Sequence, residues 1–219
     1  ISGSYGGAAM SGGGADATIV NGNVTLAEVD GTVSDIILTG LATVSAQSLA
    51  QLVAEVDVTS IAVGLFALAA GGGTASISTG GSVAARVSGV EMTAGSLSVS
   101  ALSGISQRTT VWGMTVGATA GVGASVAAVA TSRSVAATVG GSSGTYHLGS
   151  LTVEAEAGGI NGSTIEDVAA YASGGGLLLG VQSTSATATN TSQVDAGIES
   201  GATLIVSGNA VISASGSVV

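Results

Sequence analysis

The chain has 219 residues, of which 37 are glycine, five are aromatic and none are cysteine or proline, and it carries 13 carboxylates against three arginines. This acidic balance excludes nucleic-acid binding, which needs a basic surface, and argues against binding to anionic lipid. The absence of cysteine excludes a disulfide scaffold. No apolar run is long enough for a membrane-spanning helix, so we expect no membrane insertion.

A repeated phrase divides the chain into similar units. Its copies lie at residues 41–48, 96–103, 150–157 and 209–216, so their starts are almost evenly spaced. Self-similarity at a nearly fixed period predicts a stack of repeats rather than a compact globule. The predicted units are residues 1–40 (partial, with an insertion), 41–95, 96–149, 150–208 and 209–219 (partial), which together form one continuous domain, and we expect a piece of a longer chain.

The insertion in the first unit is inferred from a second landmark. Clear copies of this landmark begin at Val83, Val135 and Val194, and each precedes the next phrase by a similar interval. A fainter copy at residues 15–19 precedes its phrase by a much longer interval. This longer gap predicts an insertion at about residues 23–38, long enough for an extra strand or coil.

The second unit contains two distinctive segments. Apolar residues at Leu49, Leu52 and Val56 have helical spacing, which allows a short helix over residues 46–56, although glycine and β-branched residues are too frequent for an all-helical chain. Residues 69–75 form a block of small residues, and similar blocks follow at residues 117–123 and 174–180. We interpret these blocks as turns in which neighbouring backbones approach closely.

The third unit shows the strand pattern most clearly. Leu97, Val99 and Ala101 alternate with serines, which is the signal of a half-buried strand. At the end of the unit stands His147, the chain's single histidine, and we expect it to lie in a turn. One histidine without cysteine supplies neither a structural zinc site nor a convincing catalytic triad.

The fourth unit carries most of the acidic candidates. Glu154 and Glu156 alternate with apolar residues, and because the sister phrases lack acids there, we interpret them as a solvated strand face. Glu166 and Asp167 are weak calcium candidates. The alternating threonines of residues 187–191 are not repeated in other units, which argues against an ice-binding array.

A third weak calcium candidate, Asp16, lies near the start of the chain. Residues 11–19 are similar to the calcium-binding RTX nonapeptide, but Ser11 and Thr18 break its pattern and the copy stands alone. We therefore expect no metal site and no cofactor. Three asparagines lie in glycosylation sequons, which chance also produces in a chain rich in serine and threonine; they are Asn23, Asn161 and Asn190.

These patterns together predict an all-β fold, an elongated parallel β-helix (β-solenoid). A β-sandwich array is the rival, but sandwich domains normally contain larger core residues and a buried Trp or Tyr. A unit of about 55 residues is longer than one ordinary coil, so we expect two to three coils in each unit. At roughly 4.8 Å of rise per coil, about ten coils would make a rod on the order of 50 Å long.

The phrase Ser-Leu-Thr-Val-Glu-Ala at residues 150–155, the block at residues 174–181 and the turn-like residues 198–205 resemble repeats of giant bacterial filamentous adhesins and exoproteins. The families are the leukotoxin-like filamentous adhesins and the large haemagglutinin-type surface proteins. The resemblance covers about residues 41–219. It implies an extracellular or cell-surface β-helix that serves as a stalk or fibre, and it implies no catalytic residues.

The first functional hypothesis is therefore a non-catalytic structural segment of such a fibre or stalk, which continues in a longer chain or associates end to end. The alternative is a module that recognises a glycan or host surface through a lateral face. That alternative requires aromatic residues of different units, Trp112, Tyr146 and Tyr171, to converge. An enzyme is not expected, because β-helical lyases and hydrolases carry clustered Asp, Arg and Lys that this chain lacks.

Overall fold

The computed structural model describes residues 1–31, 35–141, 144–160 and 166–217. Within these residues the chain forms fifteen β-strands and no α-helix, and every strand pairing is parallel. The prediction of an all-β chain is confirmed, and it follows from alternating polarity combined with poor helix formers.

The strands form one long sheet and two short sheets. The long sheet contains β1 (Ser2–Tyr5), β4 (Ile36–Val63), β7 (Glu91–Gly117), β10 (Thr145–Gly158), β11 (Glu166–Gly175), β14 (Thr203–Val206) and β15 (Ala210–Gly216). The first short sheet contains β2 (Ala8–Asn21), β5 (Phe66–Thr79), β8 (Ala120–Thr131) and β12 (Leu179–Asn190). The second short sheet contains β3 (Val24–Asp30), β6 (Ser82–Ser88), β9 (Ser134–Gly140) and β13 (Gln193–Ile198).

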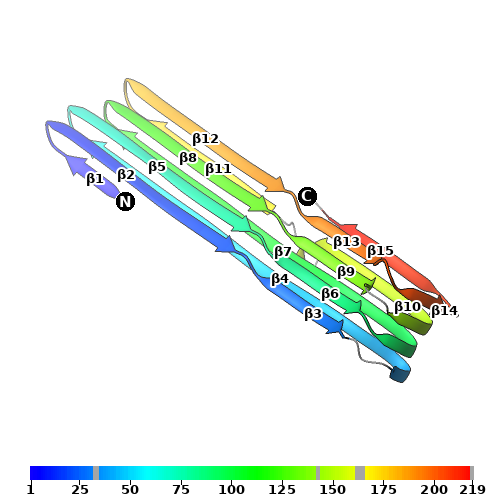
Figure 1. The fold of residues 1–219 in the computed structure, drawn as a ribbon. Coiled ribbons are helices and arrows are strands. Elements are labelled where there is room, and N and C mark those ends of the chain that lie inside the picture. Colours follow the sequence, from blue (N-terminus) through cyan, green and yellow to red (C-terminus); the bar gives the residue numbers. More distant parts are fainter. Residues whose placement is uncertain (32–34, 142–143, 161–165, 218–219) are drawn as a thin grey trace.

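The chain visits the three sheets in a fixed order, which Figure 1 makes plain: one run along the long sheet, then a return through the two short sheets. We call each such passage a circuit. The four circuits begin with β1, β4, β7 and β10, and β14 and β15 begin a fifth. The long sheet faces the two short sheets, and a thin core of small and branched side chains lies between the layers.

The repeated phrases lie side by side in the long sheet, in the register that the sequence suggests. Ser96 pairs with Leu41 on one side and with Ser150 on the other. Leu97 and Val99 are 1% and 0% exposed, and the alternating serines lie on the outer face. Identical polarity at paired positions stabilises this register, since a one-residue slip would turn every apolar side chain outward.

The expected number of coils in each unit is wrong. One unit makes one circuit: Leu41 pairs with Ser96, and among the described residues no strand pairing joins two positions of the same unit. The 28 residues of β4, at roughly 3.3 Å each, span about 90 Å, whereas four circuits at about 4.8 Å each stack to only about 20 Å. The long dimension of the molecule therefore follows the strands.

The expected insertion at about residues 23–38 is also wrong. Residues 15–19 pair with residues 73–77 of β5, so they are not the first copy of the landmark. Its true position is residues 25–29 in β3, which pair with residues 83–87 of β6. Residues 15–19 resembled the landmark only because their apolar residues alternate with polar ones, as they do in most strands of this chain.

Two local expectations in the second unit fail for related reasons. Residues 46–56 form no helix and lie within β4, because pairing with β7 imposes alternation and leaves Leu49 and Val53 half-exposed. The small-residue block at residues 69–75 is not a turn but lies inside β5. A Cβ at Gly73 would lie 2.9 Å from Cγ1 of both Val56 and Val111, so glycine there lets the two layers close.

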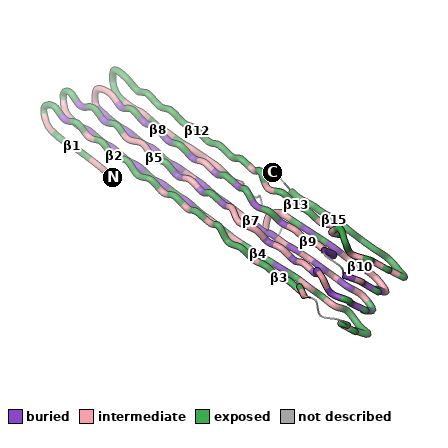
Figure 2. Tube along the Cα trace, in the orientation of Figure 1, coloured by how far each residue is buried: buried purple, intermediate pink, exposed green. Residues whose placement is uncertain are grey.

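Burial is greatest in the middle of the stack, as Figure 2 shows for the strands between β5 and β10. Strands β12 and β15 are more open, and eleven of the twelve residues of β12 are exposed. The two largest apolar clusters of the core lie one against each short sheet. Between them lies a polar waist of buried side chains, consisting of Ser48, Ser103, Gln107, Thr131 and Arg133.

Candidate functional site

An aromatic pair on the outer face of the long sheet is the clearest candidate site. Trp112 of β7 pairs in register with Tyr171 of β11, and Asp57 of β4 lies beside Trp112 on its other flank. The next outward row consists of Thr59, Met114 and Ser173. We call these six residues the aromatic patch.

The two rings of the aromatic patch stack on each other. Their centroids are 4.0 Å apart and their planes are inclined by 14°. Trp112 remains 54% exposed and Tyr171 47% exposed, so neither ring is part of the core. A shallow depression of about 520 Å³ lies over the patch. Tyr171 covers one face of the indole of Trp112. The other face of the indole is therefore directed toward β4, which carries Asp57 and Thr59.

The chemistry of the patch suits a polar ligand with a flat apolar side. Exposed aromatic rings offer large contact areas, and the carboxylate of Asp57 accepts hydrogen bonds. Glu55, one outward row away on β4, adds a second negative charge. The neighbouring cation, Arg108, is already paired through its Nε with Oδ2 of Asp167 at 3.0 Å.

Tyr146 does not join the patch. It is fully buried in the core cluster against the second short sheet, and its hydroxyl donates a hydrogen bond to the Val87 carbonyl at 3.4 Å. Burial raises the pKa of the Tyr146 phenol above its ordinary value. Of the three aromatic residues that the binding alternative requires to converge, two therefore meet and Tyr146 does not.

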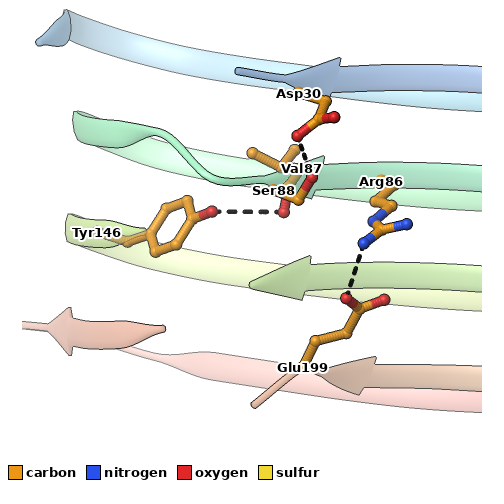
Figure 3. Close-up of polar contacts among 6 residues, drawn as sticks. All are labelled: Asp30, Arg86, Val87, Ser88, Tyr146 and Glu199. Carbon is orange, nitrogen blue, oxygen red and sulfur yellow. Dashed lines mark hydrogen bonds and ion pairs between the residues drawn. The ribbon is translucent and has the colours of Figure 1, made fainter. Parts of the chain in front are cut away.

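Tyr146 belongs to a polar cluster at one end of the sheets, drawn in Figure 3. Ser88 donates to Oδ1 of Asp30 at 2.8 Å, which joins the first two circuits. Nη2 of Arg86 and Oε2 of Glu199 are 3.1 Å apart, so this ion pair reaches past the third circuit to the fourth. Each of these contacts links two different circuits, which indicates a structural role.

The polar waist contains the third arginine. Arg133 lies in the turn between β8 and β9 and is 3% exposed. Removal from water lowers the pKa of its guanidinium. Nothing in the sequence distinguished it from the other two arginines, because its burial depends on which residues the turn brings opposite the long sheet.

The three calcium candidates lie apart. Asp16 is on the outer face of β2, where its Oδ1 accepts a hydrogen bond from Thr74, while Glu166 and Asp167 are on β11 in the other layer. As neighbours in a strand, Glu166 and Asp167 point to opposite faces, and Asp167 is paired with Arg108. Among the residues described, no group of three or more acidic or histidine side chains forms a potential metal site.

The sequon asparagines differ in their surroundings. Asn23 is exposed in the turn between β2 and β3. Asn190 ends β12, is partly buried, and its Oδ1 accepts a hydrogen bond from the Ser192 amide at 2.9 Å. Asn161 lies outside the described residues. Glycosylation at these positions stays a prediction.

The remaining candidates are on solvated surfaces. Glu154 and Glu156 are exposed on β10, opposite Ser100 and Leu102. The expected turn position of His147 is wrong: His147 is exposed within β10, because the strand already begins two residues before it. Thr187 and Thr189 face alanines on β8, and Thr191 lies beyond the end of β12, so these threonines form no array across circuits.

No family model, curated protein sequence or solved structure matches this chain. The resemblance to filamentous adhesins therefore stays a prediction. The described part of the chain contains no helix of the length and hydropathy needed to cross a membrane.

One sequence signal pointed toward the aromatic patch. The interval from Trp112 to Tyr171 equals the interval between the starts of the last two phrases. In a stack of circuits, residues separated by the local repeat interval become neighbours. The same argument predicts that Asp57 lies beside Trp112, because the interval between these two residues equals the interval between the starts of the first two phrases.

Proposed function

We propose that this chain is a structural segment of an extracellular β-solenoid fibre or adhesin stalk, and that it has no catalytic role. The observation that carries the proposal is the in-register pairing of equivalent strands from circuit to circuit. Each added circuit extends the same hydrogen-bond ladders along one axis. The molecule then serves as a spacer whose length grows with the number of circuits.

The two ends of the stack support continuation. β2 and β3 are edge strands at one end, and β12 and β13 are edge strands at the other. Unpaired edges are templates for further pairing. We propose that a further circuit, from the same chain or from another copy, covers each edge. The chain as a whole has a net charge of −10, and repulsion between like-charged molecules disfavours lateral clumping.

A pair of lysine substitutions tests end-to-end assembly. Ala186 of β12 pairs with the buried Ala127, so it lies on the inward face of the last circuit, whereas Thr187 points outward. An inward charge blocks an edge strand. We expect the isolated chain and Thr187→Lys to form rods with an axial repeat of about 4.8 Å in electron microscopy, and Ala186→Lys to remain as single particles. Single particles for the unmodified chain at every concentration would contradict end-to-end assembly between copies.

A second function, recognition of a glycan by the lateral face, is favoured by the aromatic patch. Two stacked rings are exposed where a stalk alone requires none, and Asp57 lies beside the free face of Trp112. We propose that a neutral sugar ring packs on the indole while its hydroxyls donate to Asp57. The acidic surroundings disfavour sialylated or sulfated glycans.

A glycan array followed by calorimetry tests this second function. Trp112 is the single tryptophan, so its intrinsic fluorescence reports directly on an occupied patch. We expect Trp112→Ala to lower affinity for any neutral glycan that binds by at least about 30-fold, as for a central aromatic contact. Tyr5→Ala, which removes an aromatic residue that is 90% exposed elsewhere, is the matched control. An equal loss of glycan affinity in both variants, or no glycan binding by the unmodified chain, would contradict this second function.

A further inference from the structure

The buried guanidinium of Arg133 is incompletely satisfied. Its Nη1 donates to Oγ of Ser103 at 2.7 Å and its Nη2 donates to Oγ of Ser48 at 3.0 Å. Its Nε has no hydrogen-bond partner among the described residues. Two neutral hydroxyls therefore surround a cation whose exposure is only 3%.

Arg133 differs from the other two arginines in its charge partners. Arg86 pairs with Glu199 and Arg108 pairs with Asp167, but no described carboxylate forms an ion pair with Arg133. A guanidinium does not lose its proton in proteins, and a buried charge without a counter-charge is strongly destabilising. A negative charge beside this side chain would therefore stabilise the fold.

A small cavity lies against Arg133, and residues of the third circuit, the fourth circuit and the incomplete fifth circuit line it. Its volume is about 40 Å³, which exceeds the space that one water molecule needs. This volume is too small for a sugar or a nucleotide. The polar residues that line the cavity besides Arg133 are Ser103, Thr131, Asn190, Ser192 and Ser217, and no acidic side chain of the described residues lines it.

The lining presents hydrogen-bond donors. Oγ of Ser103 accepts from Arg133, and Oγ1 of Thr131 accepts from Nε2 of Gln107 at 2.8 Å. Oδ1 of Asn190 accepts from the Ser192 amide, so the Asn190 amide group keeps its hydrogens. Each of these groups already acts as an acceptor and retains an O–H or N–H to donate. A ligand that only accepts hydrogen bonds suits such a lining.

We propose that this cavity binds a monatomic anion, chloride, held by Nε of Arg133 and the hydroxyls of Ser103 and Thr131. A water molecule would fill the space and accept from Nε, but it would leave the buried charge uncompensated. Chloride supplies both the acceptor and the charge. Because residues of three successive circuits line the cavity, the anion joins these circuits in addition to the strand pairing.

Chloride dependence of stability tests the site. Thermal unfolding is measured in sodium chloride and in sodium gluconate, whose anion does not fit the cavity, at equal ionic strength. Above the dissociation constant, each tenfold rise in chloride should raise the ratio of folded to unfolded chain about tenfold, with no such rise in gluconate. Arg133→Gln should abolish the difference, and Arg108→Gln, which makes the same charge change on the surface, should keep it. Equal stability in both salts would overturn the proposal.

Crystals of the unmodified chain soaked in sodium bromide give a second test that does not depend on a variant folding. We expect an anomalous difference peak within hydrogen-bond distance of Nε of Arg133. A water molecule at that position with no anomalous signal, in crystals that bind bromide elsewhere, would overturn the proposal.

Discussion

At the residue scale, the inward and outward positions of one strand differ sharply in what they contribute. Leu151 is 1% exposed and packs between the layers, whereas Glu154, further along β10, points to solvent. We expect Leu151→Ala to lower the free energy of unfolding by about 2–5 kcal/mol, through lost transfer energy and the cavity left behind. Urea unfolding measures this change.

Glu154→Ala is the matched control in the same strand. We expect it to change the free energy of unfolding by less than about 0.5 kcal/mol, as for a solvated surface residue. A loss comparable to that of Leu151→Ala would show that Glu154 is part of a structural or binding site, against our interpretation of a solvated strand face.

Tyr146 gives the chain a predictable response to alkaline pH. Burial raises its pKa in the folded state above the unfolded value of about 10. The stability that this residue contributes is therefore fully present below about pH 10 and is lost as the pH rises through the folded-state pKa. We expect the urea midpoint of the unmodified chain to fall in that range, and the fall to be smaller in Tyr146→Phe.

Tyr5→Phe is the control for this pH dependence, because Tyr5 is 90% exposed. It should keep the alkaline fall of the unmodified chain. If the urea midpoint falls equally in Tyr146→Phe and Tyr5→Phe, the buried phenol of Tyr146 is not the cause of the alkaline fall.

At the scale of the element, the turns between the two short sheets set how closely circuits stack. Gly81, between β5 and β6, has a φ of +98°, and a Cβ there would lie 2.0 Å from the Asn23 carbonyl oxygen of the preceding circuit. The amide of Ser82 donates to that same oxygen at 3.1 Å. Only glycine fits this position without moving the backbone of the neighbouring turn.

We expect Gly81→Ala to destabilise the chain by at least about 1–3 kcal/mol, the cost of a left-handed conformation for a non-glycine residue, because the clash adds to it. Gly12→Ala, within β2, meets no atom closer than 3.9 Å and should be neutral or slightly stabilising. Thermal unfolding of both variants tests this, and equal midpoints would show that the turn relaxes freely.

At the scale of the whole molecule, stability should follow position in the stack. Strands β7 and β8 have a paired neighbour on both sides, whereas β12 is an edge strand. In stacked repeats each unit is stabilised mainly by its neighbours, and regions with few buried contacts open first. We expect amide hydrogen exchange to be slowest in β7 and β8 and fastest in β12 and β15. Uniform exchange along the chain would show instead that the four circuits unfold as one unit.

The strand character of this chain and the register of its phrases can both be predicted from the residue pattern. Alternation at period two requires one buried face, and Leu97 and Leu151 at equivalent positions of successive phrases leave one favourable alignment. The same repeat interval could have predicted that Trp112 and Tyr171 meet. These features depend on local pattern and on spacing, both of which can be counted along the chain.

The size of the circuit and the content of the interior depend on tertiary contacts that the residue pattern does not specify. The spacing between phrases is the same whether a unit makes one circuit or three. The spacing therefore does not predict that β4 is 28 residues long. Which residues lie opposite a given strand depends on the turns between strands, and the lengths of these turns vary along the chain. The first landmark, placed wrongly from its sequence pattern, is an example. No local pattern predicted that Arg133 and Tyr146 would be buried. Their burial depends on which residues the facing layer supplies.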